Sequence, residues 1–91
     1  MSRRRVVVTG LGIISPVGNS IAAAWENILA GKSGIGPITN FDVADFPVRI
    51  AGEIRDFDAS DFIPGKDARR MAAFIHYGIA AASQAITDAG L

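Results

Sequence analysis

The sequence predicts an α/β fold of which these 91 residues form only a part. The first observation is the run Val6–Val8, because an uninterrupted β-branched segment is typical of a strand buried on both faces inside a parallel sheet. The second is the following loop, where Gly10 and Gly12 allow a close approach of the backbone to another element. The third is a shortage of neighbours: only one other segment has a strand-like pattern, and one buried strand is not a sheet.

The first helix is predicted after this loop. Asn19 or Ser20 can cap its N-terminus, because both side chains accept hydrogen bonds from free backbone N–H groups. Gly31 is expected to end it in a left-handed conformation. The apolar residues that repeat at helical spacing along it are Ile21, Trp25, Ile28 and Leu29.

The middle of the chain is predicted to be mostly irregular. Residues 32–47 have the composition of a loop, since glycine and proline interrupt any regular element there. Residues 48–55 alternate apolar and charged side chains, which indicates a half-exposed edge strand with an apolar face of Val48, Ile50 and Ile54 and a charged face of Arg49, Glu53 and Arg55. The acid-rich segment that follows is expected to be a loop packed on the body by Phe57, Phe62 and Ile63.

The longest predicted element is a helix from about Lys66 to Ala89. Gly78 lies in its interior, where glycine costs roughly 1 kcal/mol relative to alanine, so we expect a close contact there with another element. Gly90 is expected to cap the C-terminus. The apolar stripe of this helix consists of Met71, Ile75, Ile79, Ala82 and Ile86.

Composition excludes several classes of function. The formal net charge is zero, which argues against a whole-surface attraction to nucleic acid or to an anionic membrane. There is no cysteine, hence no disulfide and no thiol nucleophile within these residues. No apolar run approaches the roughly twenty residues that cross a bilayer, so a soluble cytoplasmic protein is expected.

From the inventory of elements we infer that residues 1–91 are the N-terminal fragment of one larger domain; the alternative is a complete small α+β domain.

The glycine loop only partly matches a dinucleotide-binding motif. Ser15 stands where the third glycine of G-x-G-x-x-G is needed, and the acidic residue expected about twenty positions later is missing. Tight backbone packing is therefore the better interpretation of Gly10 and Gly12, and no cofactor is predicted.

Titratable residues form no catalytic constellation. His76 is the only histidine, and a lone helical histidine is usually a surface or boundary residue. Asp56 and Asp58 lie in an acid-rich loop, where solvation is the ordinary explanation of paired carboxylates.

The basic residues Lys66, Arg69 and Arg70 have spacings of three and four, which predict one face in the first turns of the long helix. The helix dipole is already positive there, so three cations would create a concentrated anion-attracting spot. A solvated face that Asp67 partly compensates is the alternative interpretation.

Several segments together resemble the N-terminus of the β-ketoacyl-[acyl carrier protein] synthases, especially the elongating type II enzyme of bacterial fatty acid synthesis. The resemblance begins with Val-Val-Val-Thr-Gly-Leu-Gly-Ile-Ile-Ser-Pro-Val-Gly-Asn at residues 6–19 and spans essentially the whole chain. It continues through Trp25, Leu-Ala-Gly-Lys-Ser-Gly-Ile at 29–35, Phe41-Asp42, Ala51-Gly52, Asp56-Phe57 and Arg-Met-Ala-Ala-Phe-Ile-His-Tyr-Gly at 70–78.

This resemblance implies the N-terminal part of a thiolase-like fold, with layered helices and mixed sheets, usually in a homodimer. It implies a parent acyltransferase that elongates fatty acids by decarboxylative Claisen condensation of an acyl-enzyme with malonyl-carrier. The catalytic cysteine and histidines are expected beyond Leu91, so the fragment itself is predicted inactive. The partners it implies are the remainder of the synthase chain and the acidic acyl carrier protein. In the family, basic residues of the synthase dock this carrier protein, and Lys66, Arg69 and Arg70 fall at matching positions.

Three alternatives remain open at this point, and the third is a nucleotide-binding domain, which a cofactor titration would test. A ketosynthase-like partner subunit would keep the fold without the nucleophile, and the residue at the downstream nucleophile position separates it from the enzyme. A small stand-alone interaction module would instead fold cooperatively by itself, whereas a fragment would expose the Met71–Ile86 stripe or its strand edges.

Overall fold

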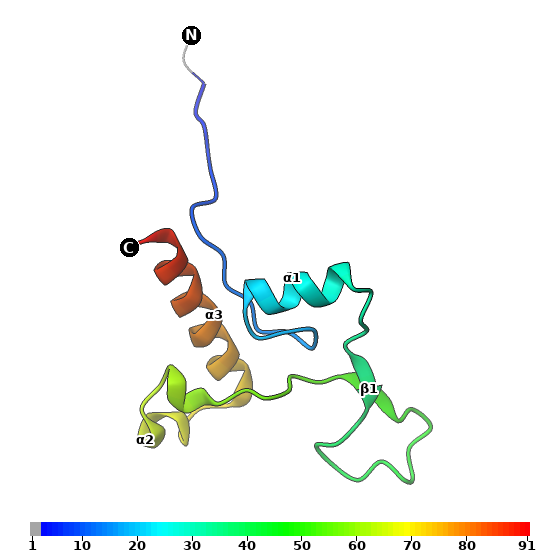
Figure 1. The fold of residues 1–91 in the computed structure, drawn as a ribbon. Helices are drawn as coiled ribbons and strands as arrows, with labels where there is room; N and C mark the ends of the chain where they lie inside the picture. Colours follow the sequence, from blue (N-terminus) through cyan, green and yellow to red (C-terminus); the bar gives the residue numbers. More distant parts are fainter. Residues whose placement is uncertain (1–2) are drawn as a thin grey trace.

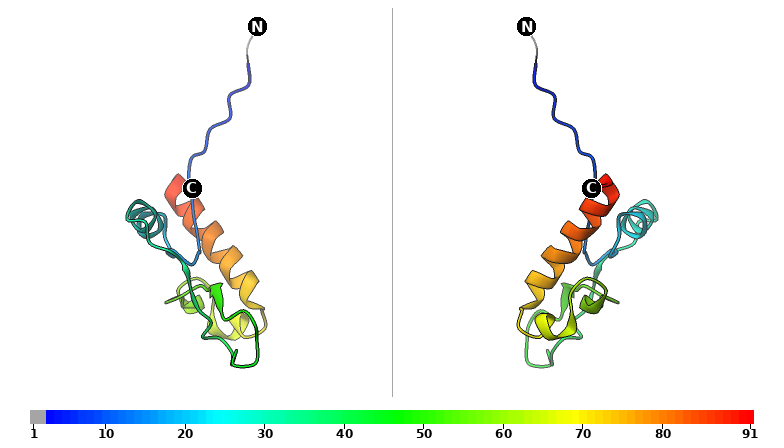
Figure 2. Two further views of the ribbon diagram at one scale, coloured as in Figure 1. Left: turned by 90° about the vertical axis from the view of Figure 1, so that its right-hand side faces the viewer. Right: turned by 90° about the vertical axis from the view of Figure 1, so that its left-hand side faces the viewer.

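The computed structural model describes residues 3–91. The N-terminal segment passes between the two longer helices, and a small two-stranded sheet and a pair of short helical turns lie at the other end of the molecule (Figures 1 and 2). In chain order the elements are α1 (Ile21–Leu29), β1 (Ile35–Pro37), β2 (Ile50–Gly52), the 3-10 helix η1 (Ala59–Asp61), α2 (Gly65–Ala68) and α3 (Ala73–Ala89).

The N-terminal segment lies against α3 because two glycines permit it. A side chain at Gly12 would collide with the carbonyl oxygen of Ala81 and lie 2.8 Å from Cβ of Gln84, and one at Gly10 would collide with Ala85. The predicted close approach of the backbone at both glycines is therefore confirmed. Its partner is the alanine-rich face of a helix that begins more than sixty positions later in the chain.

Side chains of α3 also bind the backbone of this segment. Gln84 Oε1 accepts from the N–H of Ile13 at 3.1 Å, and Asp88 Oδ2 accepts from the N–H of Leu11 at 2.9 Å. Four residues of a helix rise about 6 Å, and two residues of extended chain span about 6.6 Å, so the two spacings match. The helix thus satisfies alternate N–H groups that a neighbouring strand would otherwise bind.

Val6–Val8 form no strand among the described residues. Their exposed fractions are 93%, 75% and 76%, and the segment is drawn as an extended trace that projects from the body (Figure 1). The prediction of a strand is wrong for the chain as it stands here, because a strand requires a hydrogen-bonded neighbour and no segment within 3–91 pairs with these valines. That the missing neighbours lie elsewhere in a longer protein stays a prediction.

The first helix has the predicted boundaries. Ser20 is the N-cap, and its hydroxyl accepts from the N–H of Ala23 at 3.2 Å. Gly31 has φ +70° and, with Lys32, returns hydrogen bonds to the carbonyls of Ile28 and Asn27, which is the Schellman arrangement. Gly90, with φ +78°, closes α3 in the same left-handed conformation.

The small sheet differs from the prediction in two ways. First, residues 35–37 form β1 inside the predicted loop, and Gly36 pairs with Ala51 of β2 in an antiparallel register. Glycine and proline hide this strand in the sequence, but a three-residue edge strand tolerates both. Second, the predicted strand 48–55 is reduced to β2, and its apolar face is not the covered one, since Ile50 is 57% exposed.

The buried residue next to this sheet is Glu53, which is 8% exposed. Its carboxylate accepts from the N–H of Thr39 at 3.0 and 3.2 Å, from the hydroxyl of Thr39 at 3.0 Å and from the N–H of Asn40 at 3.1 Å. Burial by itself raises the pKa of Glu53, but these hydrogen bonds and the nearby Arg55 outweigh it and bring the pKa below its ordinary value. Of the predicted charged face only Glu53 turns inward, where its carboxylate binds these loop N–H groups, while Arg49 and Arg55 stay exposed.

The predicted helix 66–89 is divided. α2 ends at Ala68, and α3 begins only at Ala73. Residues 69–72 have good helix propensity, so we attribute the break to tertiary contacts of the flanking residues rather than to local sequence.

The predicted apolar stripe of this helix is exposed among the described residues, as we expect of a fragment, and Met71 precedes the start of α3. Ile79 and Ile86 are 37% and 53% exposed, whereas Ala80 is fully buried. The alanines of α3 face the N-terminal segment, because the backbone at Gly10 and Gly12 can approach a helix this closely only where its side chains are small. Within residues 3–91 nothing lies within 4 Å of a Cβ at Gly78, so the predicted close contact is not made by the part of the chain that the structure describes.

The covered core is small. Among residues 3–91 the buried hydrophobic residues are Ala24, Ile63 and Ala80. The radius of gyration is 16.7 Å, against about 12 Å for a compact chain of this length. No helix within the described residues is both long and apolar enough to cross a membrane.

Candidate functional site

The strongest candidate site is an exposed basic turn, which we define as residues 66–70. Lys66 belongs to α2, Arg69 ends that helix and Arg70 follows it, and all three side chains are exposed. The backbone is closed by hydrogen bonds from the N–H of Arg69 to Gly65 at 3.2 Å and from the N–H of Arg70 to Asp67 at 3.1 Å. Three cations therefore lie within five residues of folded backbone.

The structure corrects the predicted setting of these residues. They do not share a face in the first turns of a long helix, because α2 has only four residues and α3 begins after them. Arg69 and Arg70 lie at the carboxyl end of α2, so the argument from a positive helix N-terminus does not apply to them. What remains of the prediction is the concentration of positive charge, which the side chains themselves supply.

An aromatic cluster supports the basic turn from the segment that precedes it. Phe57 stacks on Phe62 with ring centroids 6.1 Å apart and meets Tyr77 of α3 edge to face at 5.2 Å. Such pairs contribute about 0.5–1.5 kcal/mol each beyond their buried area. Ile63, 5% exposed, directly precedes Pro64 at the start of α2. The prediction that aromatic side chains pack this loop on the body is confirmed.

His76 joins the turn to α3. Its Nε2 lies 2.8 Å from the carbonyl oxygen of Ala68, which also accepts from the N–H of Met71 at 3.1 Å. The predicted boundary position of this histidine is confirmed, since the side chain is half-buried. The contact itself was missed because a continuous helix would separate residues eight apart by about 12 Å along its axis. Only the break after Ala68 brings the two together.

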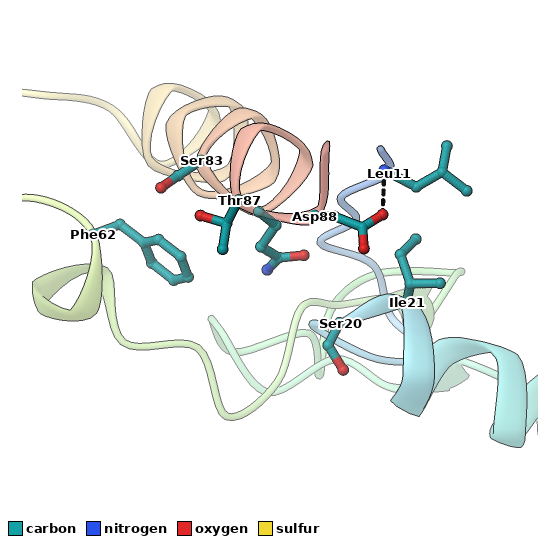
Figure 3. Close-up of a pocket in the computed structure, with 8 residues that line it drawn as sticks. Leu11, Ser20, Ile21, Phe62, Ser83, Thr87 and Asp88 are labelled. Atoms are coloured by element: carbon teal, nitrogen blue, oxygen red, sulfur yellow. Dashed lines mark hydrogen bonds between the residues drawn. The ribbon is translucent and has the colours of Figure 1, made fainter. Parts of the chain in front are cut away.

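The open pocket in Figure 3 has a different character. Its volume is about 450 Å³, and it lies between the N-terminal segment, the start of α1 and the polar side of α3. Ser83, Thr87 and Asp88 line its α3 side, and Asp88 is the side chain that binds the Leu11 N–H (Figure 3). No hydrogen bond within residues 3–91 joins the Asp88 carboxylate to the hydroxyl of Ser83 or Thr87, so the pocket shows no activated nucleophile.

Asp58, the second carboxylate of the acid-rich loop, has a structural role. Asp58 accepts from the N–H and hydroxyl of Ser60 at 2.9 and 2.7 Å, and these hydrogen bonds hold the pKa of Asp58 below its ordinary value. It is the N-cap of η1. Among residues 3–91 no three histidine, cysteine or carboxylate side chains gather as a metal site would require.

Comparison with known proteins connects this geometry to a family. The family model described as "Beta-ketoacyl synthase, N-terminal domain" matches residues 3–91. Two curated relatives are named 3-oxoacyl-[acyl-carrier-protein] synthase 2. The one from Vibrio harveyi is 53% identical and the one from Synechocystis sp. is 48% identical, each over all 91 residues.

A solved structure, the ishigamide ketosynthase/chain length factor, has a TM-score of 0.85 and 40% sequence identity over 99% of this chain. The match covers 22% of that chain, and likewise 22% of each of the two curated relatives. The chain thus spans about a fifth of the length of the proteins it matches.

Proposed function

Because the chain belongs to the β-ketoacyl synthase family, we propose that the full-length protein elongates acyl chains carried by acyl carrier protein. The reaction would be a decarboxylative Claisen condensation of an enzyme-bound acyl group with a malonyl unit. The 91 residues contribute the N-terminal part of the thiolase-like fold of such synthases. The identity of about 50% over the whole chain to synthases that bear this name is the main support.

In this proposal the reacting groups come from the rest of the protein. Acyl transfer needs a nucleophilic thiolate, and the condensation needs groups that polarise the thioester carbonyl. These residues contain no cysteine, and the one histidine is bound to a backbone carbonyl. We therefore assign to the fragment a structural and docking role, without a cofactor.

We further propose that the basic turn docks the acidic carrier protein. The observation that supports it is the projection of Lys66, Arg69 and Arg70 from one short, backbone-bonded turn. Clustered exposed charges of one sign accelerate encounter with an oppositely charged partner and orient it. The alternative, a solvated surface that Asp67 partly compensates, predicts no effect of these cations on carrier binding.

Charge reversal tests the docking role. In the full-length synthase, Arg69→Glu with Arg70→Glu should weaken binding of acyl carrier protein by about tenfold or more at low salt and reduce the salt dependence of binding. Arg3→Glu with Arg4→Glu is the matched control, because it makes the same change of net charge at another exposed cluster. Unchanged affinity in the first variant, or an equal loss in both, would remove the assignment.

A partner subunit without the nucleophile is the second candidate. It is favoured by one observation, the similarity to a structure described as a ketosynthase/chain length factor. Condensation activity of the full-length protein, and a cysteine at the downstream nucleophile position, would exclude it. A stand-alone interaction module is less well supported, because so few hydrophobic residues are buried within 3–91. We also propose that the full-length protein is a cytoplasmic homodimer.

A further inference from the structure

We infer that His76 is a positioning residue for carrier docking, which holds the basic turn through its hydrogen bond to the carbonyl of Ala68. The inference rests on the proposed docking function. The contact reaches the last residue of α2, directly before Arg69 and Arg70, so it fixes the backbone from which both guanidinium groups extend.

Among residues 3–91 neither α2 nor α3 has a side-chain cap at its N-terminus. Pro64 begins α2 without a side-chain cap, and Ala72 begins α3 without one. Because α2 has only four residues, its own backbone hydrogen bonds cannot hold it firmly in the absence of outside contacts. His76 is placed where a side chain can tie the short helix to the long one.

The chemistry of the contact requires only an N–H at the right reach. A carbonyl oxygen accepts, so Nε2 of His76 donates, and it can do so as the neutral tautomer or as the imidazolium. A glutamine side chain places an amide N–H at a similar distance from its backbone. An asparagine has the same amide on a shorter side chain, and a leucine has no donor.

The expected effect is on the geometry of docking, since the charge of the basic turn does not change. Long-range attraction sets the association rate, whereas the close fit of cations to carboxylates sets the dissociation rate. Loss of the hydrogen bond leaves the cations in place but lets the turn move. Docking must then order it again, which weakens binding.

The experiment uses the full-length synthase and acyl carrier protein, with association and dissociation rates measured separately. We expect His76→Leu to raise the dissociation rate about threefold to tenfold, as the loss of one hydrogen bond of ordinary strength predicts, with the association rate unchanged. His76→Gln should restore the original rate, and His76→Asn should not. Turnover of an acyl thioester without carrier protein is the control, and it should not change.

The outcomes separate this inference from the docking proposal. If reversal of Arg69 and Arg70 weakens binding but His76→Leu does not, the positioning role is overturned and the docking surface stands. If the reversal itself has no effect, both fall. Equal losses in the glutamine and asparagine variants would overturn the role of the hydrogen bond. That last comparison also decides the question if His76→Leu fails to fold.

Discussion

Gly12→Ala should destabilise the protein, because the new methyl group has no space. It would lie 2.8 Å from Cβ of Gln84 and collide with the carbonyl oxygen of Ala81, where ordinary contact begins near 3.4 Å. The segment and α3 must therefore separate by at least about 0.6 Å. The hydrogen bond from Ile13 to Gln84, already 3.1 Å long, would then exceed 3.5 Å and be lost.

The magnitude follows from these two changes. Overpacking costs about 1–3 kcal/mol, and a lost hydrogen bond of this kind about 1 kcal/mol. We therefore expect the free energy of unfolding to fall by about 2–4 kcal/mol, a large part of the total for a protein domain. Gly78→Ala is the matched control in α3, since no described residue lies within 4 Å of its Cβ, and it should gain up to about 1 kcal/mol.

Equilibrium urea unfolding, followed by far-ultraviolet circular dichroism, measures both variants. A midpoint for Gly12→Ala equal to that of the original protein would refute the close approach of the N-terminal segment to α3. A loss of stability in Gly78→Ala would show that this glycine contacts another part of the protein, as the sequence pattern first suggested.

Two further changes probe the middle of the chain. The pKa of Glu53 is lower in the folded state than in the unfolded state, so the ionised carboxylate stabilises the fold. This stabilisation is complete above the ordinary carboxyl pKa and is lost as pH falls through the pKa of the folded state. Glu53→Gln should therefore be less stable than the original protein near neutral pH, and urea titrations at descending pH should show that difference shrinking. Ser20→Ala should lower the free energy of unfolding by about 1 kcal/mol, because it removes the N-cap of α1. The control Ser83→Ala, on the exposed side of α3, should change the free energy of unfolding by no more than a few tenths of a kcal/mol. Thermal unfolding measures both variants, and equal losses would contradict the role of the cap.

Features that depend on neighbouring residues were predictable from the sequence. The cap at Ser20 and the left-handed Gly31 depend on side chains and φ angles within a single turn of chain, so α1 has the expected boundaries. The closeness at Gly10 and Gly12 was also predictable, because only glycine lacks the atom that would prevent it. The basic residues of the candidate site were identifiable from their spacing, although their setting was not.

The amino-acid sequence by itself determined the α/β class, the resemblance to condensing enzymes, the first helix and the cations of the basic turn. Tertiary structure alone decided that the long helix breaks after Ala68, that Glu53 is buried in place of Ile50, and that α3 covers its alanines rather than its isoleucines. Each of these outcomes depends on a contact between segments well separated along the chain. Local propensity at residues 69–72, or alternation at 48–55, contains no information about the groups that such a contact brings near.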